Sequence, residues 1–143
     1  MKKHPKFAPK TPPFWAIFAL VFALFAPPLA AKTAINLVKL GSVPAMDEAI
    51  NTSQVVPNGK TVYLKRLGGL APAVSGAVWS YVVLQWGSGS AWTTIRAGYG
   101  TFDFSIGRDF VGDGTSRFRL IRRNKSAKTA LEIGAWFEAL VKD

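Results

Sequence analysis

The chain has 143 residues, of which 18 are lysine or arginine and 8 are aspartate or glutamate, so its formal net charge is +10. It contains no cysteine, and its single histidine is His4. Catalytic Ser–His or Cys–His pairs and the usual zinc-ligand sets are therefore excluded beyond the N-terminal segment. The positive balance favours contact with polyanions such as acidic glycans, anionic lipid or nucleic acid, although charge of this kind also serves solubility.

The first 31 residues follow the three-part order of a secretory signal peptide. They contain four lysines and no acidic residue, an apolar run extends from Phe14 to Ala26, and Leu29-Ala30-Ala31 supplies small residues for cleavage. The run is shorter than the roughly 20 residues that a membrane span needs, and two prolines end it. We expect cleavage after Ala31 and a single exported domain over residues 32–143. The alternative is that residues 1–31 remain as a membrane anchor.

Short runs of apolar and β-branched residues, separated by Gly, Pro and Asn, predict strands along the chain. In the first half they are Ala34–Leu40, Thr52–Val56 and Thr61–Arg66, with Met46–Ile50 as a helical turn or loop. Asn58-Gly59 is a strong hairpin signal, so we expect the strands on either side of it to pair. Gly68–Gly76 has the composition of a loop.

The stretch from Tyr81 to Ile106 predicts three antiparallel strands joined by two glycine-containing turns. These strands are Tyr81–Trp86, Ala91–Arg96 and Thr101–Ile106. A register that sets Leu84 opposite Thr93 and Ile95 opposite Phe102 sorts the side chains onto two faces. The apolar face, expected to face the core, consists of Val82, Leu84, Trp86, Ile95, Phe102, Phe104 and Ile106.

The end of the chain predicts a closing hairpin. Ser116–Arg123 has strand alternation, whereas the spacing of apolar residues in Thr129–Val141 suits either a helix or a strand. We favour the strand, because it places the alternate residues from Leu131 to Val141 on one apolar face and because Gly134 costs a helix about 1 kcal/mol relative to alanine. Three cross-strand pairs follow: Phe118 with Ala135, Leu120 with Ile133, and Arg117 with Trp136. The whole pattern predicts an all-β fold, an antiparallel β-sandwich of jelly-roll type.

The polar face of the three central strands is the first candidate site. It centres on Trp92, with Tyr81, Gln85, Arg96 and Asp103 around it. Tyrosine and tryptophan rings can stack on sugar rings while neighbouring polar groups bind hydroxyls, so this face predicts glycan binding. The alternative is that a second sheet covers the face and that its aromatic residues belong to the core.

The second candidate site is a cluster of basic residues near the end of the chain. Its members are Arg117, Arg119, Arg122 and Arg123, to which the following loop adds Lys125 and Lys128, and such a group can bind phosphate or sulfate. The alternative is a solvated strand whose charge is balanced by Glu132 and Glu138. We expect no enzyme activity, metal or cofactor, because a catalytic pair of carboxylates needs a cleft that short turns do not build.

Two runs, VVLQWGSGSAWTTIRAGYGTF and FVGDGTSRFRLIRRNKSA, resemble small β-sandwich modules of bacteriophage virion proteins. Over residues 61–141 the shared pattern is a strand, a glycine turn, a Trp-Thr strand, a second glycine turn and an Arg-rich strand. The resemblance implies a structural subunit that assembles with itself or with another protein, in a virion or on a cell surface.

The residues themselves favour a different reading, an exported non-enzymatic surface-binding module for a glycan or another surface polyanion. Membrane contact is expected only if the N-terminal segment stays attached.

Overall fold

The computed structural model describes residues 33–72 and 79–142, which form eight β-strands and no helix. The strands are β1 (Leu37–Val43), β2 (Glu48–Thr52), β3 (Thr61–Leu70), β4 (Ser80–Ser88), β5 (Ala91–Tyr99), β6 (Phe102–Val111), β7 (Arg117–Asn124) and β8 (Leu131–Lys142). The predicted strand near the C-terminus is therefore confirmed over the helical alternative. The predicted signal peptide, residues 1–31, lies outside the described residues. Within the described ranges there is no helix that could cross a membrane.

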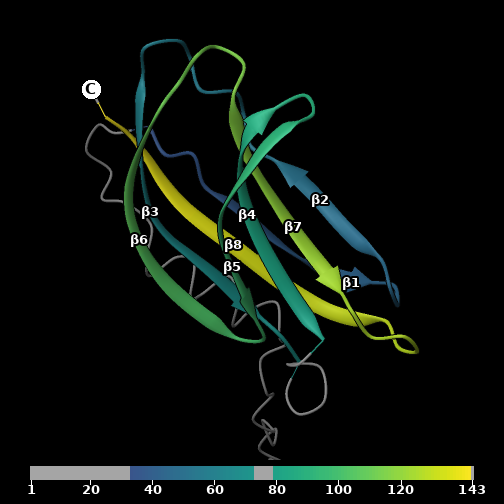
Figure 1. Ribbon diagram of the computed structural model, residues 1–143. Coiled ribbons are helices and arrows are strands. Elements are labelled where there is room, and N and C mark those ends of the chain that lie inside the picture. The colour runs from purple at the N-terminus through teal and green to yellow at the C-terminus, as the bar shows by residue number, and fades with distance from the viewer. Residues whose placement is uncertain (1–32, 73–78, 143) are drawn as a thin grey trace, which may run out of the picture.

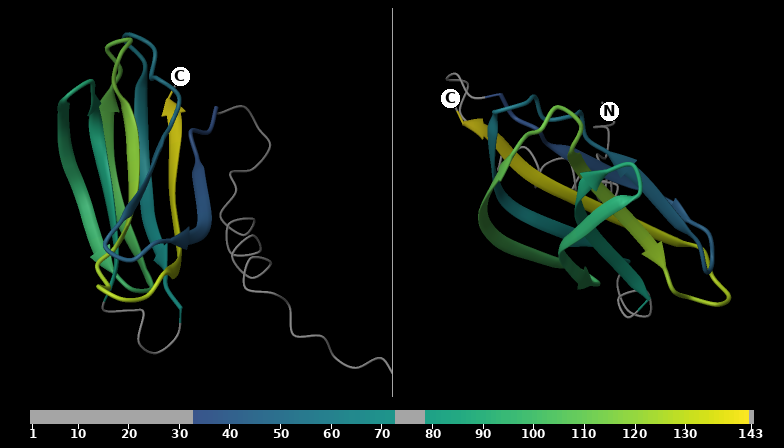
Figure 2. Two further views of the ribbon diagram at one scale, coloured as in Figure 1. Left: turned by 90° about the vertical axis from the view of Figure 1, so that its right-hand side faces the viewer. Right: turned by 45° about the horizontal axis from the view of Figure 1, so that its top comes forward.

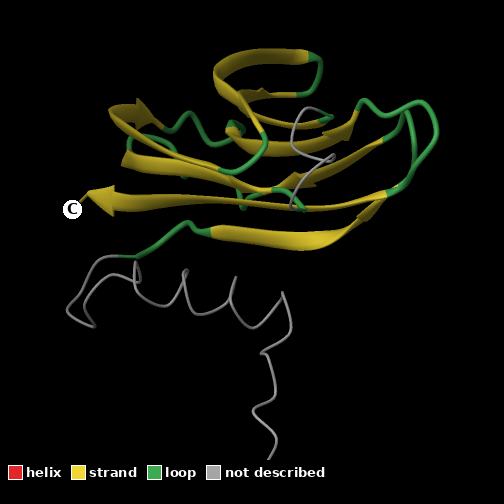
Figure 3. Ribbon diagram, turned by 90° about the horizontal axis from the view of Figure 1, so that it is seen from below, coloured by secondary structure: helices red, strands yellow, loops and turns green. Residues whose placement is uncertain are grey.

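The strands lie in two antiparallel layers (Figures 1 and 3). Sheet A has the order β1-β8-β3-β6, and sheet B has the order β2-β7-β4-β5. In Figure 2 the blue β1 and the yellow β8 run side by side along sheet A. First and last strands pair, as do second and seventh, third and sixth, and fourth and fifth. This nesting is that of one long hairpin, bent between β4 and β5 and rolled up into a jelly roll, so the predicted fold class is confirmed.

The core lies between the sheets, where alternate side chains of both layers meet. The buried apolar cluster contains Ile35, Val43, Val56, Val62, Leu64, Leu67, Val82, Leu84, Phe110, Phe118, Leu120, Leu131, Ile133, Ala135, Phe137 and Ala139. Aromatic rings join the layers at its centre. The ring of Phe118 in sheet B lies 5.1 Å from that of Phe137 and 5.4 Å from that of Phe110, both in sheet A.

The central stretch contains one hairpin rather than two. β4 pairs with β5, but β6 crosses to sheet A and pairs with β3. The register also differs, because Ser88 pairs with Ala91 and a β-bulge beside Leu84 then shifts β5 by one further residue. Leu84 consequently lies opposite Arg96 rather than Thr93. The predicted apolar face nevertheless faces inward, with Phe104 half-buried and stacked on Phe102 at its edge.

The other two predicted hairpins, at Asn58-Gly59 and at the end of the chain, are instead connections that cross from one sheet to the other. β7 belongs to sheet B and β8 to sheet A, so the predicted pairs Phe118–Ala135 and Leu120–Ile133 are not neighbours in one sheet, although all four residues belong to the core between the sheets. Arg117 and Trp136 lie on opposite outer faces of the sandwich, and their predicted contact is wrong. In each of these connections, β2 to β3 and β7 to β8, consecutive strands contribute apolar residues to the same core without sharing backbone hydrogen bonds.

The first half of the chain also departs from the expected pattern. β2 begins at Glu48, within the segment Met46–Ile50 for which the sequence predicts a helical turn or loop. The strand predicted over Thr52–Val56 is wrong beyond Thr52, where β2 ends, and β3 continues to Leu70 through part of the predicted loop. Gly59 adopts a left-handed φ of 77° in the expected turn, but that turn leads from the edge of sheet B into sheet A. An Asn-Gly turn therefore joins two layers here, not two paired strands.

Asp113 holds the turn between β6 and β7. Its carboxylate accepts hydrogen bonds from the backbone N–H groups of Thr115 and Ser116, at 2.9 and 2.6 Å, and from both of their hydroxyls. The backbone bonds from Thr115 and then Ser116 are the main cause of a pKa of Asp113 well below its ordinary value of 3.8.

The acid stability of the protein is expected to depend on this turn. Because the pKa of Asp113 is depressed in the folded state, its ionised carboxylate contributes to the free energy of unfolding above about pH 4. This contribution is lost as the pH falls through the folded-state pKa. Asp113→Asn removes the titrating group. As the pH falls below about 4, the free energy of unfolding is therefore expected to decrease less in the variant than in the parent protein. Thermal denaturation across this range measures the difference, and parallel curves of stability against pH for the two proteins would show that the ionisation of Asp113 does not contribute to stability.

Candidate functional site

The outer face of sheet B gathers the predicted aromatic and basic residues into rows set by strand register. The rows are Glu48, Arg123, Tyr81 and Tyr99; then Ile50, Ile121, Val83 and Ala97; then Thr52, Arg119, Gln85 and Thr94; and last Arg117, Gly87 and Trp92. The face therefore has a polar and aromatic region at each end and an apolar row between them. We call the two regions the tyrosine end and the tryptophan end.

Arg119 organises the tryptophan end. Its Nε and Nη2 atoms donate to Oε1 of Gln85 at 2.8 and 2.5 Å, and Nε2 of Gln85 donates to the hydroxyl of Thr94 at 3.2 Å. The guanidinium carbon lies 4.1 Å from the ring centroid of Trp92, whose Nε1 donates to the carbonyl of Gly89 at 2.8 Å. The cation and the indole are thus fixed against each other in a cation–π contact.

The tyrosine end repeats this combination with different residues. The rings of Tyr81 and Tyr99 lie 4.5 Å apart, and Nζ of Lys125 lies 4.3 Å from the first and 5.0 Å from the second. The same ammonium donates to the hydroxyl of Tyr99 at 2.6 Å. Arg123 is bound instead to Glu48, with 2.8 Å between Nε and Oε2. Among the described residues Lys125 is therefore the cation of this end that no carboxylate neutralises.

The balance of charge on this face is strongly positive. The four rows and the adjoining Lys125 contain four basic side chains, Arg117, Arg119, Arg123 and Lys125, against the single carboxylate of Glu48. A surface of this kind attracts anions and speeds their approach. Trp92, Tyr81 and Gln85 of the predicted aromatic site are thus brought together on one surface with three of the four predicted polyanion-binding arginines.

Arg96 and Asp103 do not join this surface. The bulge in β5 sets Arg96 opposite the core residue Leu84, and its guanidinium lies 4.4 Å from the ring of Phe104 in sheet A. Asp103 belongs to sheet A, where one carboxylate oxygen lies 3.6 Å from Nη1 of Arg66. Of the four residues expected around Trp92, the structure places Gln85 and Tyr81 on its face, with Tyr81 at the far end.

Arg122 is turned inward, unlike its neighbours in β7. It is 8% exposed, and its Nη1 donates to the carbonyl of Ile133 in the opposite sheet at 3.0 Å. Burial lowers the pKa of its guanidinium, and the charge of Glu132 opposes this effect. Alternation with the outward Arg119 and Arg123 requires this orientation, so the expectation that Arg122 binds a polyanion is corrected.

Two members of the site were not predicted beside Trp92: Tyr99 was not predicted to bind a ligand, and Lys125 was predicted only as part of the separate basic cluster. Tyr99 was assigned to a turn, but β5 continues through it, and the bulge returns it to the face of Trp92. Lys125 follows the end of β7, and only the packing of β7 against β4 brings it over Tyr81. The local sequence offered little signal for the first residue, because Ala97 and Gly98 before it both disfavour a strand. The position of the second residue depends on a non-local contact.

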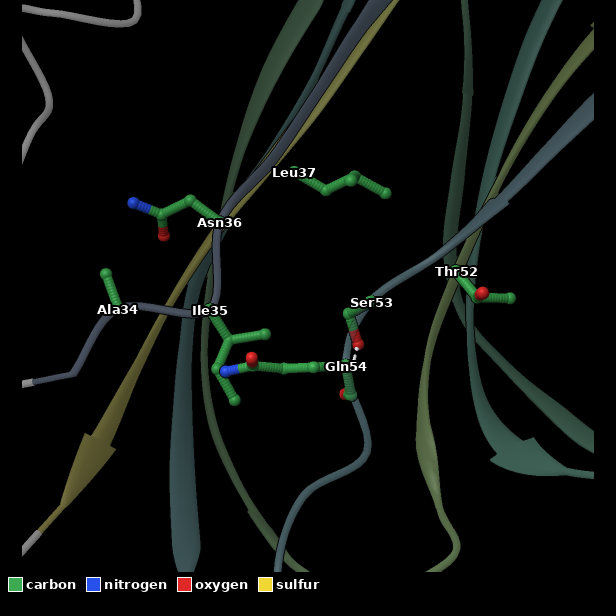
Figure 4. A pocket seen from close by; sticks show the side chains of 7 residues that line it. All are labelled: Ala34, Ile35, Asn36, Leu37, Thr52, Ser53 and Gln54. Atoms are coloured by element: carbon green, nitrogen blue, oxygen red, sulfur yellow. Dashed lines mark hydrogen bonds between the residues drawn. The ribbon is translucent and has the colours of Figure 1, made fainter.

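A hollow of about 200 Å³ opens at the edge of the sandwich where β1 and β2 lie, between the residues around the start of β1 and those around the end of β2 (Figure 4). Residues 34–37 line one wall and residues 52–54 the other, and the side chain of Gln54 extends toward Ile35. The lining consists of apolar, hydroxyl and amide side chains, none of which serves readily as a general acid or base. In the described part of the chain, no three potential metal ligands come together.

Comparisons with known proteins place the chain in no family. No family model matches the sequence, and no curated protein matches it closely. Three solved structures show limited likeness. The Yersinia pseudotuberculosis-derived mitogen has a TM-score of 0.47 at 16% identity, over 76% of this chain and 86% of that one. The Drosophila NLP core, described in connection with pentamer formation and histone binding, has a TM-score of 0.34 at 11% identity, over 71% and 96% of the two chains. PirA has a TM-score of 0.40 at 10% identity, over 78% and 99%. The resemblance to phage virion modules is not confirmed by these comparisons.

Proposed function

We propose that the protein is an exported, non-enzymatic binding module and that the outer face of sheet B binds glycans carrying carboxylate or sulfate groups. The observation that carries this proposal is the fixed group of Arg119, Gln85 and Trp92. It places a cation, an amide and an indole side by side on an exposed sheet. These are the groups needed to bind an anion, sugar hydroxyls and the apolar side of a sugar ring.

The local geometry reduces the cost of binding. Two nitrogens of Arg119 are held by Gln85, and its remaining nitrogen, Nη1, bonds no described residue. The side chain therefore loses little conformational entropy when a ligand arrives, and it can direct Nη1 to an anionic oxygen. Trp92 is similarly held by its bond to Gly89. A rigid site of this kind is favourable for weakly binding ligands such as sugars.

Loss of the Arg119 charge is expected to weaken glycan binding. Arg119→Gln removes the cation and the contact with Trp92, so the affinity for a sulfated oligosaccharide should fall about tenfold or more, as measured by calorimetric titration. Arg108→Gln is the matched control, because Arg108 is exposed on β6 in the other sheet and also lies over an aromatic ring, at 5.0 Å from Phe110. Equal losses in both variants would assign binding to overall charge and refute the proposal.

Trp92→Ala tests the aromatic part of the same site. The variant is expected to lose glycan binding while its melting temperature stays within a few degrees of the parent, since Trp92 is only half-buried on an outer face. Glycan-array binding and thermal denaturation measure the two effects. A large loss of stability would show that Trp92 is a structural residue and would leave the glycan site without its ring.

A second candidate function is that of a structural subunit, in a virion or a cell-surface assembly. The observation in its favour is the apolar row in the middle of the same face, where Ile50 is 48% exposed beside the buried Ile121. Association with another copy would cover this row. Sedimentation of the protein at increasing concentration separates the candidates, because a subunit should self-associate and Ile50→Asp should prevent it.

A further inference from the structure

We infer that the ligand is a linear acidic glycan that lies along β7 and β4 and binds both ends of the face at once. This inference rests on the proposed function and adds the length, direction and charge pattern of the ligand. It follows from the presence of two separate cationic and aromatic groups on one continuous sheet surface.

The distance between the two ends sets the length of the ligand. Arg119 and Arg123 are four residues apart in β7, and their partners Gln85 and Tyr81 are four residues apart in β4. At about 3.3 Å per residue the two rows lie about 13 Å apart. A single sugar ring is much shorter than this distance, so one monosaccharide cannot reach both ends. An oligosaccharide with anionic groups on non-adjacent sugars can do so.

The middle row sets the pattern of charge. The row is an apolar floor in which Ile50, 48% exposed, and the half-buried Ala97 offer a ligand accessible surface, whereas Ile121 and Val83, 3% and 5% exposed, offer little. No charged side chain belongs to this row, so an anion placed above it gains nothing from the protein. The C–H side of a sugar ring suits such a floor. A nucleic acid strand carries a phosphate at every nucleotide and would hold charge over the apolar row.

The two ends differ in strength. At the tryptophan end, Arg117 and Arg119 form no ion pair with any described carboxylate. At the tyrosine end, Glu48 neutralises Arg123 and leaves Lys125 as the effective cation. A short acidic glycan should therefore bind mainly through Arg119. A longer one gains a second contact at Lys125, at the high effective concentration that the first contact creates.

The test is a titration with sulfated oligosaccharides of increasing, defined length, starting from a disaccharide. Affinity is expected to rise about tenfold or more at the length that reaches both ends and to change little beyond it. Lys125→Met should remove this rise, and Arg119→Met should weaken binding at every length. Lys142→Met is the matched control, because Lys142 also lies over a tyrosine, 5.4 Å from the ring of Tyr63, but in sheet A. The control should keep the full length dependence.

The outcomes separate the inference from the function on which it rests. Equal affinity at all lengths, with Arg119→Met still impaired, would overturn the two-ended ligand and leave the glycan site intact. Loss of the length dependence in Lys142→Met as well would assign it to general charge and overturn the inference. Absence of binding at every length would overturn the proposed function itself. If duplex DNA competes for the site as well as the longest oligosaccharide does, both the proposed glycan-binding function and the inferred linear glycan ligand would be overturned.

Discussion

Phe118→Ala is expected to lower the free energy of unfolding by about 3–5 kcal/mol, the cost of removing a fully buried phenylalanine and leaving a cavity. The ring is inaccessible to solvent and lies 4.8 Å from that of Trp86 in its own sheet and 5.1 Å from that of Phe137 in the other. It therefore joins the two layers at the centre of the core. Urea denaturation measures the change, which should appear in the midpoint with little change in slope.

Phe104→Ala is the matched control for this substitution. Phe104 is half-buried at the edge of the sandwich, where its ring stacks on Phe102 at 4.6 Å and lies under Arg96. Its truncation leaves a site that solvent can reach, so the loss of stability should be clearly smaller. A loss at Phe118 no greater than at Phe104 would mean that the sheets do not share a core at this point.

The sequence identifies the faces of the strands more reliably than their partners. Alternation sorts residues within one strand, so the inward set from Val82 to Ile106 and the apolar side of β8 were both predicted. Turn residues indicate that the chain reverses direction, but not whether the strands on either side of the turn pair with each other. The glycine-rich segment at Gly98–Gly100 and the Asn58-Gly59 pair could each join paired strands or carry the chain to the other layer. Which of the two occurs is determined by the packing of the two complete sheets.

The jelly-roll topology explains why most expected hairpins failed. Its pairs lie far apart in the sequence, as in β1 with β8 and β2 with β7, and the bend between β4 and β5 is the only local pair among them. A pattern search that assigns neighbours in sequence as neighbours in space therefore finds this one hairpin. The distant partners require the packing of two complete sheets, which no local stretch specifies.

The candidate site shows the same division. Trp92 and Gln85 were predicted together, because β4 and β5 form the one local hairpin. Arg119 reaches them only because β7 pairs with the other side of β4, so the aromatic and basic candidates appeared as two sites. A bulge of one residue was enough to remove Arg96 from the face, since every shift by one residue exchanges the two sides of a strand. Basic composition alone also failed to distinguish the inward Arg122 from its outward neighbours.

The inward position of Arg122 predicts that replacing this residue has a large effect on the free energy of unfolding. Its guanidinium lies between the sheets, makes one hydrogen bond, to the carbonyl of Ile133, and leaves Nε without a partner. No carboxylate of the described residues lies within ion-pair distance of it. The transfer of a charge from water to such a place is costly, and nothing nearby repays that cost in full.

Arg122→Met is therefore expected to raise the free energy of unfolding by about 1–4 kcal/mol, the stabilising range known for buried ion pairs that are replaced by apolar residues of similar volume. Methionine fills most of the same space and removes the buried charge, and the Ile133 carbonyl loses a single bond. Denaturation in urea measures the gain, and the affinity for the sulfated oligosaccharide should stay at the parent value, because residue 122 does not reach the outer face. Arg119→Met is the paired variant from the same strand, in which affinity falls and stability changes little. A destabilised Arg122→Met protein would show that the buried guanidinium contributes to the fold, and weakened glycan binding without loss of stability would return Arg122 to the polyanion site.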